Sequence, residues 1–183
     1  RALEEIYAKK LEEHAAELAE HFSHSSDSAD LKKAVSYGEM AAKRATDVYA
    51  YGEAVRLLEQ ALKVQEILDP EDKAKRCDLL LDLCDALLLV PDTRRIMETE
   101  APLAYSLAEN LGDRARAVRI CLAMTNACMI ENPGLHPELP KWAELASRWA
   151  MPNTPDQVLA DAYLGLVKMQ GDAVDSQGAR KLL

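Results

Sequence analysis

Apolar residues recur along most of the chain in steps of three and four. In residues 50–67 they fall at Ala54, Leu57, Leu58, Ala61 and Val64, the spacing that places side chains on one face of an α-helix. The same periodicity, interrupted by turn residues, predicts helix throughout. The predicted helices span about 3–24, 31–46, 50–67, 71–89, 92–111, 114–130, 138–150 and 156–170, and a partial ninth follows Gly171-Asp172.

Two breaks in the pattern carry local predictions. Asp92 follows Val90-Pro91 and is a plausible N-cap for the helix at 92–111. Pro102 lies inside that helix and is expected to kink or split it near Thr99, because proline lacks the backbone N–H that an interior helical residue donates.

The chain also repeats itself. Cys77 and Cys121 are 44 residues apart, as are Cys84 and Cys128, and a series of aspartates keeps nearly the same spacing. Those aspartates are Asp69, Asp113 and Asp156, each between the end of one helical pattern and the start of the next. Periods of 20 to 50 residues are typical of repeat architectures, in which helices stack on their neighbours.

Composition agrees with stacked helices and narrows the function classes. Hydrophobic residues make up 49% of the chain and aromatic residues 5%, so neither disorder nor a β-rich fold is favoured. The net charge of −9 argues against a nucleic-acid partner, which needs a basic face. No apolar run approaches the length of about eighteen residues that a membrane span requires.

The four cysteines predict a reducing environment. The members of each pair, Cys77 with Cys84 and Cys121 with Cys128, are seven residues apart on one predicted helix, roughly 10 Å along its axis and too far for a disulfide. They are interpreted as small buried side chains, and the cytoplasm is the expected location. The chain starts without Met and stops within a helical pattern. We therefore expect a single repeat domain over 1–183 that belongs to a larger protein.

Two segments resemble the tetratricopeptide-repeat family. YAYGEAVRLLEQAL, with Ala54, Leu58 and Ala61, is similar to the second helix of such a repeat. Ala162-Tyr163-Leu164-Gly165, followed by Gln170-Gly171-Asp172, looks like its first helix and turn, one residue short. The resemblance implies an α-solenoid, a right-handed superhelix of antiparallel helix pairs, here with eight to nine helices and a period of 43 to 44 residues.

A narrower resemblance concerns the protein around this region. LEEHAAELAEHF, YAYGEAVRLLEQAL and LAENLGD are similar to helical repeats of large bacterial signalling proteins that carry a nucleotide-binding ATPase module, sometimes with a cyclase or a DNA-binding domain. This resemblance implies the regulatory repeat region of a signalling ATPase or transcriptional regulator.

The sequence contains few motifs that are typical of catalysis or metal binding. There is no glycine-rich phosphate loop and no nucleophile-elbow serine. His14, His21 and His24 lie near acidic residues but match no zinc-enzyme order, so they are interpreted as a polar edge of the first helix. We therefore expect a non-enzyme without catalytic residues, cofactor or metal.

The tetratricopeptide resemblance also implies a concave groove lined by the first helix of each pair. The positions that it implies, carried over one at a time, are Ser36, Glu39, Lys43, Asp78, Leu81, Asp85, Leu88, Leu122, Thr125 and Met129. Such a groove is acidic in its middle and apolar toward its C-terminal side, which suits a basic or amphipathic peptide.

Three functions remain open at this point. The first is an interaction module that binds a protein or peptide segment, or other domains of the parent chain, and neither nucleic acid nor membrane. The second is a sensor that binds a small effector, with Leu122, Met129 and Trp142 as pocket residues, although Trp142 also fits a core position. The third, an enzyme with a site assembled between distant repeats, is the least favoured.

Overall fold

Every regular element in the described part of the chain is a helix. The structure is a computed structural model that describes residues 4–5, 7, 10–90, 92–133 and 136–180, with side chains up to Met169. No strand occurs in these ranges. The helices are α2 (Ala15–Ser23), α3 (Ser28–Asp47), α4 (Tyr51–Leu68), α5 (Lys73–Leu89), α6 (Thr93–Arg95), the π-helical turn η1 (Ile96–Glu100), α7 (Ala101–Leu111), α8 (Arg114–Glu131), α9 (Leu139–Trp149) and α10 (Pro155–Arg180).

The chain divides into two compact units, Arg1–Val90 and Pro91–Leu183. The division falls between the predicted helices at 71–89 and 92–111. A single repeat domain over 1–183 therefore stays a prediction, and each unit is described by itself.

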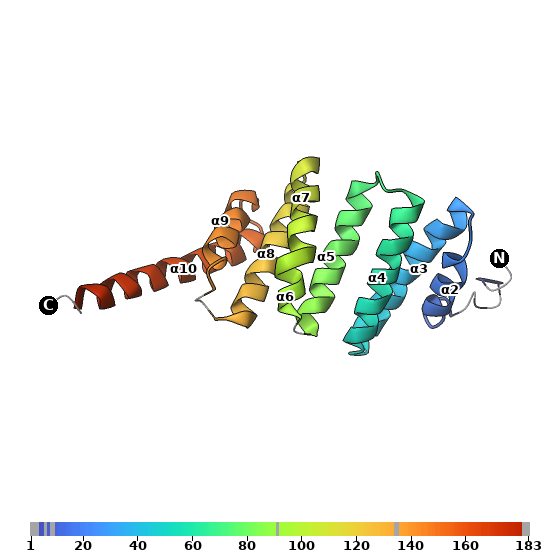
Figure 1. The fold of residues 1–183 in the computed structure, drawn as a ribbon, viewed down its shortest axis with the longest axis horizontal. Coiled ribbons are helices and arrows are strands. Elements are labelled where there is room, and N and C mark those ends of the chain that lie inside the picture. The colour runs from blue at the N-terminus through green and yellow to red at the C-terminus, as the bar shows by residue number, and fades with distance from the viewer. Residues whose placement is uncertain (1–3, 6, 8–9, 91, 134–135, 181–183) are drawn as a thin grey trace. The chain divides into compact units, whose positions relative to one another are not determined.

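Unit 1 contains α2 to α5, and each of these helices packs on the next one in the chain. Short connections join α3 to α4 and α4 to α5, so that neighbouring helices run in opposite directions (Figure 1). The faces that meet are rich in alanine and leucine, which allow close contact between helices. The side chains with no exposed surface are Ala15, Leu18, Ala54, Cys77, Leu79, Leu81 and Cys84.

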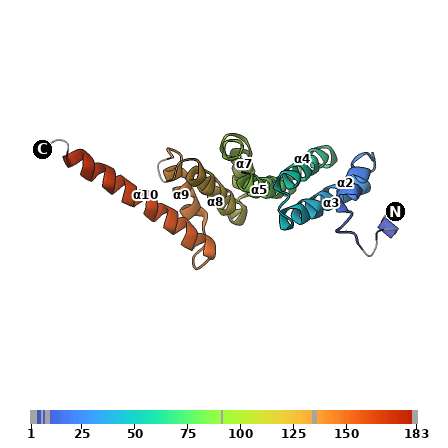
Figure 2. The same cartoon turned by 90° about the horizontal axis from the view of Figure 1, so that it is seen from below.

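Unit 2 contains α6 to α10, with α8 at its centre. α8 packs against α7 and α9, and α10 packs against α9 and touches α8 (Figure 2). Because α8 has neighbours on several sides, its buried side chains cover most of its circumference, from Ala117 to Cys128. Gly112 ends α7 in the left-handed conformation, with φ of 65°, which glycine adopts without a steric penalty.

The prediction of a break near Thr99 is confirmed. Residues Ile96–Glu100 form a π-helical turn between α6 and α7, and the Ala101 N–H donates to the Ile96 carbonyl five residues back. Pro102 follows in the first turn of α7, where its missing N–H is tolerated. Asp92 is the N-cap of α6, as predicted, because its side chain accepts from the Arg95 N–H at 3.4 Å.

The prediction of a continuous helix over 3–24 is wrong between Leu11 and His14, which form turns, while some of residues 3–9 lie outside the described part. Contacts made by the preceding segment compete with helix growth here. Tyr7 stacks on His14 with ring centroids 3.8 Å apart, and Glu4 bonds Lys33 and Tyr37 of α3. Tertiary contacts thus override the local apolar pattern.

The predicted helix end at Gly171-Asp172 is also wrong, because α10 continues to Arg180. A single glycine within a helix costs only about 1 kcal/mol relative to alanine, and flanking helical turns can absorb that cost.

The three aspartates of the 43 to 44 residue period occupy different positions at the helix ends. Asp69 follows α4, Asp113 is the N-cap of α8, and Asp156 lies in the first turn of α10. The N-cap of α5 is Asp72, whose carboxylate accepts from the Lys75 N–H at 2.9 Å. The spacing of these aspartates therefore does not mark one equivalent position.

The four cysteines are buried and form no disulfide, as predicted. Burial raises the pKa of the Cys121 thiol to about 12 and that of Cys128 to about 11, because a thiolate is poorly solvated in an apolar core. Among the described residues, no helix has the length and apolar character needed to cross a membrane.

Candidate functional site

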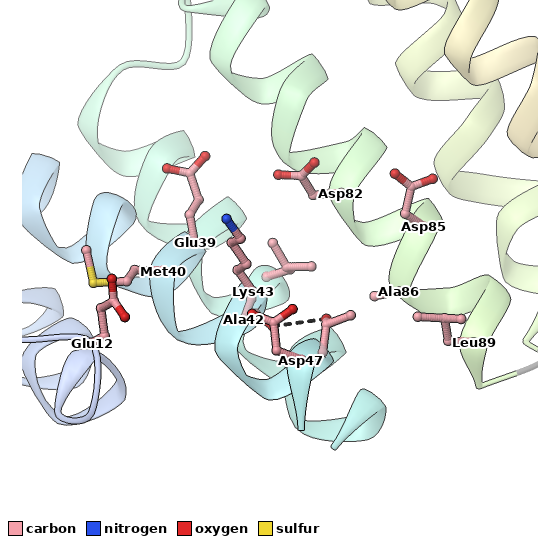
Figure 3. Close-up of a pocket in the computed structure, with 12 residues that line it drawn as sticks. Glu12, Glu39, Met40, Ala42, Lys43, Asp47, Asp82, Asp85, Ala86 and Leu89 are labelled. Carbon is pink, nitrogen blue, oxygen red and sulfur yellow. Dashed lines mark hydrogen bonds between the residues drawn. The ribbon is translucent and has the colours of Figure 1, made fainter. Parts of the chain in front are cut away.

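A cavity of about 550 Å³ in unit 1 lies beside α3 and α5 (Figure 3). α3 and α5 contribute most of its lining, α4 contributes one residue, and the segment before α2 contributes another. The lining residues are Glu12, Glu39, Met40, Ala42, Lys43, Thr46, Asp47, Leu58, Asp82, Asp85, Ala86 and Leu89. We refer to it as the unit 1 cavity.

The floor of the unit 1 cavity is apolar. Ala42, Leu58 and Ala86 are almost fully buried beneath it. Met40 is half-buried, and Leu89 is 45% exposed although it is a large apolar side chain. An exposed leucine over a hollow floored by buried apolar groups offers surface that a ligand can cover.

Charged side chains surround this floor. Five carboxylates and one ammonium group line the cavity, so its net charge is negative. Figure 3 shows Lys43 extending from α3 into the same space that Asp82 and Asp85 border from α5. The sequence of α5 explains why its carboxylates border the cavity. Acidic residues alternate there with apolar residues, and the apolar side chains point into the core.

The carboxylate of Glu39 forms an ion pair across the helices of unit 1. Lys75 Nζ lies 2.5 Å from Glu39 Oε1, and both side chains are about one quarter to one third exposed. This ion pair joins α3 to the first turn of α5 and neutralises the corner of the cavity at Glu39. Glu39 and Lys75 also line a smaller adjoining pocket of about 340 Å³, together with Ser36. Asp47, Asp82 and Asp85 line other parts of the same cavity.

The groove residues predicted in unit 1 are placed unevenly. Glu39, Lys43 and Asp85 line the unit 1 cavity, and Ser36 lines the pocket beside it. Asp78 and Leu88 are half-buried and line neither cavity, while Leu81 is fully buried, which contradicts its placement on a binding surface.

The reason is the register of α5. The cavity uses Asp82, Asp85, Ala86 and Leu89, so two of the predicted positions, Leu81 and Leu88, are displaced by one residue. One residue corresponds to a rotation of about 100° around a helix, enough to turn a side chain from the cavity into the core. Glu12 and Asp47 line the cavity without having been predicted.

The groove residues predicted in unit 2 lie largely in its core. Leu122 is 7% exposed and Thr125 is fully buried, which contradicts a surface role for both. The Thr125 hydroxyl donates within α8 to the carbonyls of Cys121 and Leu122, at 2.7 and 2.9 Å. Met129 is half-buried. Helices on several sides of α8 leave little of its surface open.

The three N-terminal histidines make separate contacts and do not form one cluster. His14 stacks on Tyr7 and lies 3.3 Å from Glu17, and His24 lies 3.0 Å from Glu20. His21 makes an edge contact with Phe22. Among the residues that the structure describes, no group of three metal-ligating side chains is brought together.

A second cavity, of about 470 Å³, lies in unit 2 and is lined by Trp142. Of the three residues expected for an effector pocket, Trp142 lines this cavity, whereas Leu122 and Met129 do not. Trp142 is only 4% exposed, so it also belongs to the core.

Comparison with known proteins identifies no related protein. No family model matches the chain, and no curated protein and no solved structure matches it significantly. The function must therefore be argued from the geometry of the cavities.

Proposed function

We propose that the chain is a non-catalytic interaction module of tetratricopeptide type, an α-solenoid that binds a protein segment or another domain of its parent. The unit 1 cavity is the binding site, and its occupant is a basic or amphipathic segment. The observation that carries the proposal is an apolar floor bordered by five carboxylates and one ammonium group. Following the narrower resemblance, the parent is a multidomain signalling ATPase or transcriptional regulator.

The two parts of the site contribute differently to binding. Burial of an apolar side chain against Leu58, Ala86 and Leu89 supplies affinity, at roughly 25 cal/mol per Å² of apolar surface removed from water. At the border of the cavity Asp85 is exposed and Asp82 is half-buried. Ion pairs at such a border contribute little affinity but select the sign of the partner's charge.

The packing of α3 on α4 supports the repeat interpretation. The family pattern places small residues where paired helices touch, and Ala54 and Ala61 of α4 are 0% and 2% exposed. Gly38 of α3 faces Ala61 and the Leu57 carbonyl. Such contacts bring two helices into a tight antiparallel pair, the unit from which a solenoid is built.

The test uses two labelled peptides of equal length and helical amphipathicity, one with leucine and lysine and one with leucine and glutamate. Fluorescence anisotropy with the 183-residue chain is expected to show tighter binding of the lysine peptide by at least tenfold. The double variant Asp82→Asn/Asp85→Asn is expected to lose most of that preference.

The matched control is Glu71→Gln/Glu144→Gln, which removes the same charge from two exposed positions outside both cavities. It is expected to bind like the unmodified chain. Equal affinity for the two peptides, or an equal loss in the two double variants, argues against the unit 1 cavity as the binding site.

A further inference from the structure

The unit 2 cavity is bordered by η1, α7, α8 and α9, and its walls are mainly apolar and aromatic. Its volume of about 470 Å³ is within the range of small-molecule sites. The apolar lining comes from Met97, Pro102, Tyr105, Met124, Trp142 and Leu145. Tyr105 and Trp142 meet edge to face, with ring centroids 5.4 Å apart and an interplanar angle of 90°.

One polar group in this lining has no partner in the part of the chain that the structure describes. The indole N–H of Trp142 is buried and finds no hydrogen-bond acceptor among the described residues. The second tryptophan of the same helix differs, because the Trp149 N–H donates to the Tyr105 hydroxyl at 3.0 Å. A buried donor without an acceptor is unfavourable and uncommon in folded proteins, and it often marks a place where a ligand or water completes the bonding.

The other polar groups around the cavity are engaged. Lys141 lies 3.3 Å from Glu138 and also sits over the Trp142 ring, 5.1 Å from its centroid. Glu98 pairs with Arg94, and His136 Nδ1 accepts from the Glu138 N–H. Lys141, the ammonium group of this lining, is therefore already paired and is not available to attract an anionic ligand. Among the described residues, the Trp142 N–H is the polar group of the lining that still lacks a hydrogen-bond acceptor.

We propose that the unit 2 cavity binds a small, flat, apolar molecule with one neutral hydrogen-bond acceptor, such as an aromatic amide or ketone. Its ring packs against Tyr105 and Trp142, and its carbonyl oxygen accepts from the Trp142 N–H. This N–H is closed to solvent in the structure, so lining side chains must shift to admit the carbonyl. Met97 and Met124 are suited to that, since methionine is unbranched and repacks easily.

The test observes the indole N–H directly. With ¹⁵N-labelled tryptophan the chain gives two indole resonances, and the variant Trp149→Phe assigns them. Benzamide is the probe, and toluene is the control without an acceptor. Benzamide at millimolar concentration is expected to move the Trp142 indole proton downfield in a saturable manner, whereas toluene does not. No shift with benzamide, or the same shift with toluene, overturns the proposal.

A pair of variants locates the binding site. Leu145→Phe narrows the unit 2 cavity and is expected to weaken benzamide binding by tenfold or more. Leu89→Phe makes the same substitution in the unit 1 cavity and is expected to leave the affinity for benzamide unchanged. The opposite pattern overturns the proposal. The titration of the unmodified chain needs neither variant, so a failure of Leu145→Phe to fold leaves the first result decisive. Since the peptide site lies in unit 1, the two proposals stand or fall separately.

Discussion

Gly38 of α3 lies so close to Ala61 of α4 that a β-carbon at position 38 would come within 3.1 Å of the Ala61 β-carbon. The same added atom would lie 3.7 Å from the Leu57 carbonyl oxygen. The absence of a side chain at position 38 therefore lets α3 and α4 approach each other closely.

A large side chain at position 38 is expected to destabilise the chain. Gly38→Leu forces α3 and α4 apart, and overpacking of this kind typically costs about 1–3 kcal/mol. Urea unfolding followed by circular dichroism measures the change. The control is Gly52→Leu in the first turn of α4, where an added β-carbon meets nothing within 4 Å. Equal losses of stability in the two variants contradict the close approach of Gly38 to Ala61.

Much of the helical organisation follows from local sequence. The apolar periodicity around Leu57 and Leu58 predicts α4 to within one residue at each end, and Pro102 predicts the break before α7. The turns before α2 could not be predicted in this way, because they depend on Tyr7 and Glu4 making contacts with residues elsewhere in the fold.

The residues of the candidate site follow from the sequence less completely than the helices do. The sequence predicts Glu39, Lys43 and Asp85 as site residues, and all three line the cavity. The predicted register of α5 is wrong by one residue at Leu81, which lies in the core, while the adjacent Asp82 lines the cavity. Periodicity alone locates the polar side of a helix but not which edge of it faces a neighbour. The sequence could not predict that the Trp142 N–H has no acceptor among the described residues, because this depends on which side chains surround it in the fold.

The N-cap of α8 is expected to contribute to stability in a pH-dependent way. Asp113 accepts from the Arg116 N–H at 3.0 Å and pairs with the Arg116 guanidinium. The backbone bond, followed by the side-chain pairing, lowers the pKa of Asp113 below its ordinary value of 3.8. A lowered folded-state pKa means that this stability is present above pH 3.8 and is lost as pH falls through the folded-state value.

Asp113→Ala is therefore expected to cost about 1 kcal/mol at pH 7, and the difference is expected to disappear in strong acid. Asp113→Asn, which keeps a capping oxygen without the charge, is expected to lose less. Thermal unfolding of the three chains between pH 7 and pH 2 measures both effects. A loss in Asp113→Ala that stays constant with pH excludes the ionised cap.

The cysteines are expected to be unreactive in the folded chain. With the pKa of Cys121 raised to about 12 and that of Cys128 to about 11, almost no thiolate forms at pH 8, and burial also blocks access. A disulfide-exchange reagent that releases a coloured thiol is expected to react with four cysteines in guanidinium chloride and with none rapidly in buffer. Fast reaction of one folded thiol is inconsistent with this packing.

Substitutions at two predicted groove positions are expected to affect folding and leave recognition unchanged. Leu81→Ala removes a fully buried side chain and is expected to cost about 2–5 kcal/mol. Thr125→Val removes a hydroxyl bonded only within α8 among the described contacts, at a cost of about 1 kcal/mol. Peptide affinity, measured where both variants remain folded, is expected to match that of the unmodified chain. A selective loss of affinity restores these residues to the binding surface.

The two parts of the unit 1 cavity are expected to separate in a salt titration. Charge attraction at an exposed border is screened over about 10 Å at 0.1 M salt, so affinity for the lysine peptide is expected to fall several-fold between 0.05 and 0.5 M sodium chloride. Lys43→Ala removes the one ammonium group of the lining and is expected to tighten binding at low salt. Leu89→Asn weakens the apolar contact and is expected to lower affinity equally at all salt concentrations, because burial of apolar surface does not depend on screening. If the loss in Leu89→Asn varies with salt as the charge effect does, the division of the site into an apolar floor and an acidic border is wrong.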